Sequence, residues 1–416
     1  MSKKTKVLVI ADHPFSPSGV GTQTRYMVEG LLQTGEFSFI CLGGAIKHKD
    51  YKPQKYEQYG DDLVVYPVDG YGNQDMIRSI LRTEKPDILW FMTDPRFFPW
   101  LWEIEDEVRA VVPMVYYHVW DNYPLPKYNK IWYDSTDVVA AISKVTHDIV
   151  ANVSPNTELH YLPHAINSEI FKPLEKNEKE NLRNSAGIEE KFVVFWNNRN
   201  ARRKQPGTLI FWFKEFLDRV GHDKASLIMH TDPEDPNGPN LHAIIHELGL
   251  TSGEIKFSTN KIDFPQMAAL YNMADVTVNI SDAEGFGLST LESLSCGTPI
   301  IVNMTGGLQE QVTDGEEWFG IGIEPSSKCI IGSQDIPYIY EDRISKDDFI
   351  DALEKMYNMT PEERGELGQK GCSHVDRNYN FKQYVVKWRN ILKDVHKNHG
   401  SWETRKRPAS WELLEV

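Results

Sequence analysis

Short apolar runs alternate with amphipathic segments along most of the chain. The runs are residues 6–11, 37–42, 63–67, 87–91, 113–117 and 137–143, followed by 192–196, 226–230, 255–257, 276–280 and 300–302. Runs that are apolar on both faces are typical of strands in a parallel sheet that helices cover on both sides. The pattern therefore predicts the α/β class, built from doubly wound parallel sheets.

A linker divides this pattern into two parts. Near the middle of the chain the apolar runs stop, and Phe171-Lys172-Pro173 and the charged segment 175–183 stand in their place. A chain of 416 residues has enough material for two cores. We therefore predict two Rossmann-like domains and a C-terminal amphipathic helix with a tail, with the boundaries 1–170, 171–380 and 381–416.

Charge and cysteine content exclude some classes of protein. The formal net charge of -15 disfavours a general nucleic-acid binder, which needs a basic surface. The four cysteines lack C-x-x-C or Cys/His metal-ligand spacing, so we expect free thiols in a reducing cytosol and no metal site. The first apolar run is too short for a signal peptide or a membrane span. We therefore expect a cytoplasmic protein, and peripheral contact with the inner face of a membrane stays open.

One stretch, residues 281–302, carries the strongest chemical signal. Glu284 and Glu292 flank a Gly285-Phe286-Gly287 turn, and the spacing of the leucines predicts a helix that begins directly after it. Free N–H groups at a helix start bind anions, and glycines let a phosphate approach the backbone. The two carboxylates could accept hydrogen bonds from sugar hydroxyls. The alternative is an ordinary helix start with two solvated acids.

The sequence Glu-Gly-Phe-Gly-Leu-Ser-x-Leu-Glu resembles the signature of the retaining GT-B glycosyltransferases of the glycogen-synthase and mannosyltransferase type, glycosyltransferase family 4. The resemblance implies two domains facing a central cleft and a metal-independent transfer of a sugar from a nucleotide-sugar donor to an acceptor of unknown identity. It implies that Glu284 is catalytic and positions the donor sugar. It also implies that the donor is bound by Gly285, Phe286, Gly287, Leu288, Ser289 and Glu292.

A basic loop follows the first strand of the second domain. Arg199 and Lys204 match the Gly-Arg-x-x-x-x-Lys segment of that family, with Asn198 in place of the glycine. Two cations beside an anion-binding helix start would hold a diphosphate and stabilise its charge as it leaves. If the loop is shifted in register, Arg202 and Arg203 would do so instead. A solvated basic loop is the alternative.

The first domain offers two further candidates. Gly19 and Gly21 follow the first strand, where the family has a glycine loop beneath the donor diphosphate and the acceptor; the alternative is a turn that needs glycine only for its shape. His118 directly follows the fifth strand, at the sheet edge where α/β proteins bind ligands. The resemblance implies that His118 lies beside the anomeric centre of the donor, and a core-edge histidine is the alternative.

Other interpretations remain open at this point. Residues 315–344 are longer than the family pattern and read as an insertion without an assigned role. A nucleotide-sugar epimerase shares the GT-B fold, and so does a phosphorylase, which needs a Schiff-base lysine for which the sequence offers no clear candidate. A third alternative is a catalytically inactive protein that binds nucleotides or sugars.

Overall fold

A computed structural model describes residues 3–189 and 191–406, and it divides into two compact units. Unit 1 holds the described residues up to Ala165 and those from Phe381 onwards, and unit 2 holds Ile166–Asn380. Residues 407–416 of the predicted tail lie outside the described part of the chain.

Unit 1 is built on an eight-stranded sheet with the order β3-β4-β2-β1-β5-β6-β7-β8. All neighbouring strands pair in parallel except the two-residue edge strand β3. The strand order reverses beside β1, as expected for a doubly wound sheet. The strands are β1 (Thr5–Asp12), β2 (Phe37–Gly44), β3 (Gln54–Lys55), β4 (Leu63–Pro67), β5 (Ile88–Thr93), β6 (Met114–His118), β7 (Val138–Ala141) and β8 (Glu158–Tyr161).

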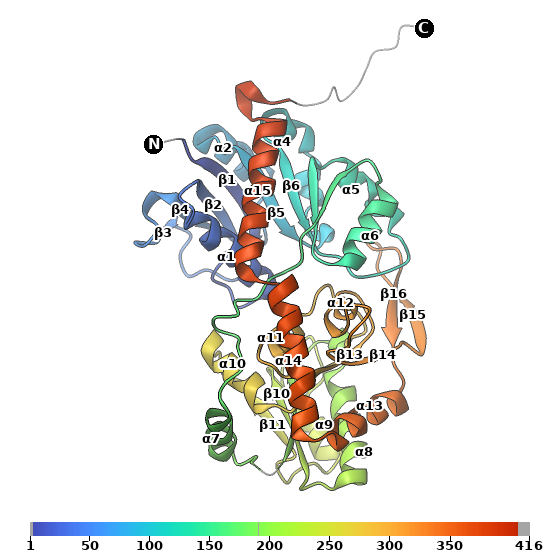
Figure 1. Ribbon diagram of the computed structural model, residues 1–416. Coiled ribbons are helices and arrows are strands. Elements are labelled where there is room, and N and C mark those ends of the chain that lie inside the picture. Colours follow the sequence, from blue (N-terminus) through green and yellow to red (C-terminus); the bar gives the residue numbers. More distant parts are fainter. Residues whose placement is uncertain (1–2, 190, 407–416) are drawn as a thin grey trace. The chain divides into compact units, whose positions relative to one another are not determined.

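The last long helix of the chain, α15 (Phe381–His399), belongs to unit 1. It contacts α1 (Gly19–Leu32), and its Trp388 is fully buried against Trp90 of β5 and Tyr117 of β6. Figure 1 shows α15 in red beside this sheet. The other helices are α2 (Gln74–Glu84), α3 (Pro99–Trp102), α4 (Glu105–Val111), α5 (Lys130–Asp134) and α6 (Lys144–Val153), with 3-10 turns η1 (Gly60–Asp62), η2 (Pro95–Phe97), η3 (Lys127–Asn129) and η5 (Trp402–Thr404).

Unit 2 contains a six-stranded, all-parallel sheet with the order β11-β10-β9-β12-β13-β14. Its strands β9 (Phe192–Asn197) and β12 (Val276–Asn279) lie at the point where the order reverses. The remaining strands of the sheet are β10 (Ala225–His230), β11 (Ile255–Ser258), β13 (Ile300–Asn303) and β14 (Gly320–Ile323). Both predicted doubly wound parallel sheets are therefore confirmed.

Several helices of unit 2 contribute to a core that includes Val194, Trp196, Phe213 and Leu353. Their ends carry strong capping signals; Thr360, for example, forms a capping box with Glu363 before the proline that opens α14. The helices are α7 (Lys176–Ala186), α8 (Pro206–Val220), α9 (Leu241–Glu247), α10 (Phe264–Met273), α11 (Leu288–Ser295), α12 (Leu308–Val312), α13 (Lys346–Asn358) and α14 (Pro361–Asn378), with the 3-10 turn η4 (Arg202–Lys204).

The segment that reads as an insertion folds largely as a hairpin. Strands β15 (Ser327–Ile331) and β16 (Ile339–Arg343) pair antiparallel as a two-stranded sheet, separate from the six-stranded one. Ile330 of β15 is 71% exposed, whereas Glu341 of β16 is buried. One side of the hairpin therefore faces solvent, whereas β16 buries a carboxylate in the unit. Figure 1 shows β15 and β16 side by side in orange.

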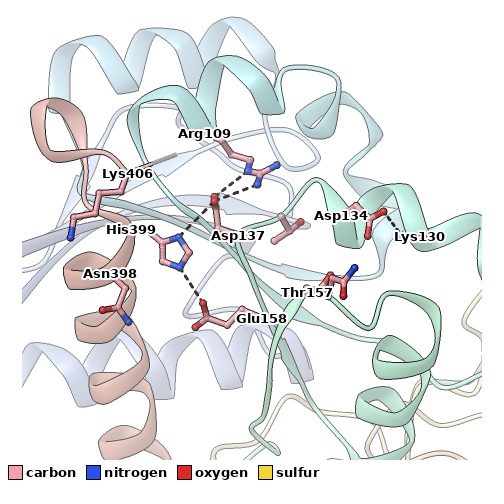
Figure 2. Close-up of a pocket in the computed structure, with 11 residues that line it drawn as sticks. Arg109, Lys130, Asp134, Asp137, Thr157, Glu158, Asn398, His399 and Lys406 are labelled. Atoms are coloured by element: carbon pink, nitrogen blue, oxygen red, sulfur yellow. Dashed lines mark hydrogen bonds and ion pairs between the residues drawn. The ribbon is translucent and has the colours of Figure 1, made fainter. Parts of the chain in front are cut away.

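A polar cavity of about 580 Å³ lies in unit 1 at the amino ends of β7 and β8. Figure 2 shows His399 between Asp137 and Glu158, with ring-nitrogen distances of 3.9 and 3.2 Å to their carboxylates. Asp137 also pairs with Arg109 at 3.2 Å and with Arg405 at 2.8 Å. This ion-pair network ties the end of α15 and the residues after it to the sheet.

Candidate active site

The predicted anion-binding turn lies between β12 and α11. Gly287 precedes the helix with a φ of 94°, and a Cβ atom there would meet the Leu308 side chain at 2.5 Å, so glycine suits both its backbone and its surroundings. Gln311 holds the turn by donating from Nε2 to the carbonyl oxygens of Phe286 and Gly287. Leu288 and Ser289 form the first residues of α11, whose N–H groups can receive an anion.

Glu284 lies at the start of this turn and is almost fully buried. Its carboxylate accepts hydrogen bonds from Lys204 Nζ and, at 3.2 Å, from Asn279 Nδ2. Burial alone would raise the pKa of Glu284, but the charges of Lys204 and Arg203 and the two hydrogen bonds outweigh it and hold the pKa below its usual range. Glu284 is therefore ionised at neutral pH.

The cationic side chains of the basic loop interact with different partners. Lys204 is buried and reaches Glu284, and Arg203 donates to the carbonyl of Ala283 at 2.5 Å. Arg199 instead pairs with Asp235 at 2.7 Å, and its side chain is 65% exposed. The structure thus brings Lys204, Arg203 and Glu284 together and puts the Arg199 side chain on the loop after β10. The spacing of Arg199 and Lys204 alone does not reveal this separation.

Glu292 lies one turn into α11 and accepts a hydrogen bond of 2.7 Å from the Tyr271 hydroxyl. Asn197 Nδ2 donates to that hydroxyl oxygen at 2.8 Å, which orients it toward the carboxylate. Burial raises the pKa of Glu292 to about 7 although the Tyr271 hydrogen bond opposes the shift. Small changes of pH around neutrality therefore alter the charge of this group.

In unit 1 the glycine loop opens α1. Ser18 caps the helix by accepting from the Gly21 amide at 2.9 Å, and its hydroxyl donates to Asp12. A Cβ atom at Gly21 would meet Ser16 Oγ at 2.1 Å, so the fold of the loop itself requires glycine there. Asp12, which also accepts from Tyr71 at 2.8 Å, is a polar residue of this edge that the sequence interpretation missed. Its position at the end of a predicted strand was the available signal.

His118 is the last residue of β6 and is fully buried. Its Nε2 lies 2.8 Å from the Tyr133 hydroxyl, and its Nδ1 has no hydrogen-bond partner among the described residues. Burial lowers the pKa of His118 to about 3, so the ring is neutral at physiological pH. The ring packs among Tyr116, Trp120 and Tyr133 at the carboxyl edge of the unit 1 sheet.

The described residues contain neither a membrane-spanning helix nor a metal-binding cluster. No helix within residues 3–189 and 191–406 is long and apolar enough to cross a membrane. In the same part of the chain, no group of three or more His, Cys, Asp or Glu side chains is arranged to hold a metal ion.

Comparison with known proteins relates one segment of the chain to a family. Residues 178–371, all within unit 2, match the family model described as glycosyl transferases group 1. The segment 178–371 therefore has the sequence pattern of the group 1 glycosyltransferases. The matched segment includes both the basic loop and the Glu284–Glu292 turn, so the family match falls on the unit 2 residues of the candidate site.

Curated relatives match this protein over part of their length. A GDP-mannose-dependent α-(1-6)-phosphatidylinositol monomannoside mannosyltransferase of Mycolicibacterium smegmatis is 26% identical over 191 residues, which is 44% of this chain and 48% of the relative. A D-inositol 3-phosphate glycosyltransferase of Paenarthrobacter aurescens is 28% identical over 138 residues, 33% of this chain and 28% of the relative. The matches thus span less than half the length of these relatives.

Solved structures match nearly the whole chain. A sucrose-phosphate synthase of Thermosynechococcus elongatus has a TM-score of 0.73 at 16% identity, over 95% of this chain and 100% of that one. The Anabaena protein HepE, solved in complex with UDP and glucose, has a TM-score of 0.68 at 14% identity, over 94% of this chain and 100% of that one. These neighbours establish the GT-B fold for this protein.

Proposed function

We propose that this protein is a retaining, metal-independent glycosyltransferase that moves a sugar from a nucleoside-diphosphate sugar to an acceptor. The observation that carries the proposal is the buried, ionised Glu284, held by Lys204 directly before the glycine turn that opens α11. This arrangement lies within the segment that matches the family. It offers a carboxylate for the donor sugar next to two features that bind phosphate.

The donor diphosphate would lie at the start of α11. The N–H groups of Gly287 and Leu288 and the helix dipole favour negative charge there. Lys204 is already beside the turn, and Arg199 would complete the site by leaving Asp235 for the diphosphate. These cations stabilise the charge that develops on the leaving nucleoside diphosphate, which is the electrostatic task that a metal ion performs in other enzymes.

Glu292 would bind the donor ribose. When ionised, its carboxylate can accept two hydrogen bonds from the vicinal hydroxyls, and Tyr271 fixes its orientation. Because the pKa of Glu292 is about 7, donor binding through this group would strengthen as the pH rises through neutrality.

Unit 1 would serve the acceptor side. The Gly19–Gly21 loop and His118 lie at the carboxyl edge of its sheet, the edge where α/β proteins bind ligands. Since His118 is neutral, it would contribute a hydrogen bond to the transferred sugar rather than a positive charge. We assign the protein to the cytoplasm, because all four cysteines are free thiols.

The decisive experiment is a panel of UDP-, GDP- and ADP-sugars, with slow donor hydrolysis read by mass spectrometry. We expect one donor to be hydrolysed by the wild-type protein and not by the Glu284→Ala variant. Glu215→Gln, which removes a charge from an ion pair with Lys346 outside the site, is the matched control and should keep the activity.

Two other outcomes would contradict the proposal. Nucleotide binding by calorimetry without hydrolysis or transfer, even with an added panel of sugar and polyol acceptors, would favour an inactive binding protein. Conversion of a donor into an isomer of the same mass, separated by chromatography, would favour an epimerase.

A further inference from the structure

Four successive residues of unit 2, Arg202 to Gln205, each form hydrogen bonds to segments near the Gly285-Phe286-Gly287 turn. The carbonyl of Arg203 accepts from the amide of Asp282 at 2.8 Å, and its side chain donates to Ala283. Lys204 reaches Glu284, and Gln205 Nε2 donates to Asp282 at 2.6 Å. The basic loop is therefore joined residue by residue to the loop that carries Glu284.

Arg202, the first of the four, is bonded to the hairpin instead. Its two Nη atoms donate to the two carboxylate oxygens of Glu341 at 2.9 and 2.6 Å, a bidentate arrangement. The Glu341 side chain is 2% exposed, whereas that of Arg202 is 60% exposed. A buried carboxylate requires a cation, so this pair resists separation.

Neighbouring residues of β16 extend the connection to the same loops. Arg343 donates to Glu341 at 2.9 Å and pairs with Asp282 at 3.2 Å. The amide of Asp342 donates to the carbonyl of Asp282 at 2.8 Å, and its carboxylate accepts from Thr305 at 2.8 Å. The hairpin thus contacts the loops that follow β9, β12 and β13. These loops lie at the proposed donor site.

We propose that Glu341 is a positioning residue for the donor diphosphate, because it holds the Arg202–Lys204 turn against the Asp282–Glu284 loop through Arg202. The inference rests on the proposed function. Lys204 follows Arg202 by two residues within one 3-10 turn, so the hydrogen bonds between Arg202 and Glu341 fix the position of Lys204 relative to α11. The insertion, which had no assigned role, becomes the support of the phosphate-binding loop.

Hydrogen–deuterium exchange on the ligand-free protein provides the first test. In Glu341→Gln, the amides of Gln205 and Asp282 should exchange faster, because both donate to carbonyls of the turn, those of Arg202 and Arg203. Glu215→Gln is the matched control and should leave these amides unchanged. Unchanged exchange in Glu341→Gln would overturn the proposal.

Calorimetry with UDP, GDP and the two corresponding nucleosides provides the second test. Glu341→Gln should weaken binding of the nucleoside diphosphate about tenfold, the effect expected for one charge-assisted hydrogen bond, and leave nucleoside binding unchanged. An equal loss for diphosphate and nucleoside would show a merely structural role and would overturn the proposal. So would an unchanged affinity for the diphosphate.

A second variant guards against failure of Glu341→Gln to fold. Arg202→Lys keeps the charge but removes the bidentate geometry, and it should produce the same two changes. In a double-variant cycle, Glu341→Gln should add little once Arg202 is replaced by Gln, since Glu341 acts through it. A wild-type protein that binds none of UDP, GDP and ADP would contradict the proposed function, and the exchange measurement would still decide the role of Glu341.

Discussion

Two buried carboxylates, Asp137 in unit 1 and Glu284 in unit 2, are each held by cations, yet they sit in different settings. Asp137 lies at the amino end of β7 and meets Arg109, Arg405 and His399. Glu284 lies beyond the carboxyl end of β12, next to a glycine turn and a helix start. Burial and ion pairing are therefore common to both, and only the position in the sheet and the adjacent turn mark a site for an anionic ligand.

The largest expected effect concerns Glu284. Glu284→Ala should lower donor hydrolysis and transfer by about 10³-fold, because it removes the carboxylate that we propose positions the donor sugar. Turnover is measured at saturating donor, and circular dichroism checks that the variant is folded. A variant with near wild-type turnover would remove Glu284 from the site.

Replacement of Asp137 by alanine should instead lower stability and leave turnover unchanged. Asp137→Ala leaves Arg109 and Arg405 without their buried partner and should lower the free energy of unfolding of unit 1 by about 3–5 kcal/mol. Urea unfolding measures the loss. Turnover per folded molecule should stay at the wild-type value, and a selective loss of turnover would mean that the cavity of Figure 2 takes part in the reaction.

The cations sharpen the comparison further. Lys204→Ala and Arg199→Ala should each lower turnover by about 10²-fold, because each removes a charge that we propose stabilises the leaving diphosphate. Arg202→Ala should lower donor affinity about tenfold and change turnover less, since we propose that Arg202 acts by holding the Arg202–Lys204 turn in position. Separate kcat and KM values measure the difference. A larger effect of Arg202→Ala than of Arg199→Ala would show that the family register is shifted in this loop.

The smallest effect is the pH dependence of Glu292. Its pKa is raised to about 7 by burial, so the folded state favours the protonated form, and the stability that this provides is lost as the pH rises through 7. Glu292→Gln should therefore have a higher Tm than the wild type at pH 8, and the difference should shrink at pH 5. Thermal unfolding at the two pH values measures it, and a constant difference would contradict the assignment of the charge.

The amino-acid sequence was sufficient to predict the fold class and the turn. Buried strands, helix starts and the Gly285-Phe286-Gly287 turn are local features, which the pattern of residues over a short stretch predicts. The structure agrees, with α11 beginning at Leu288 and both sheets parallel apart from the edge strand β3. The proximity of Lys204 to Glu284, 80 positions apart, followed only from the resemblance to a family, because no local pattern links residues at that separation.

The partners of the charged side chains were decided by the tertiary structure. From their spacing in the sequence, Arg199, Arg202 and Arg203 were alternative candidates for binding the diphosphate. In the folded protein they have separate partners, which are Asp235, Glu341 and the carbonyl of Ala283. The insertion likewise had no predictable role, because the role that we propose for it depends on Glu341, which is buried only in the folded unit. Local sequence determines which elements form, but the long-range contacts that bury or expose a charge depend on how distant segments pack.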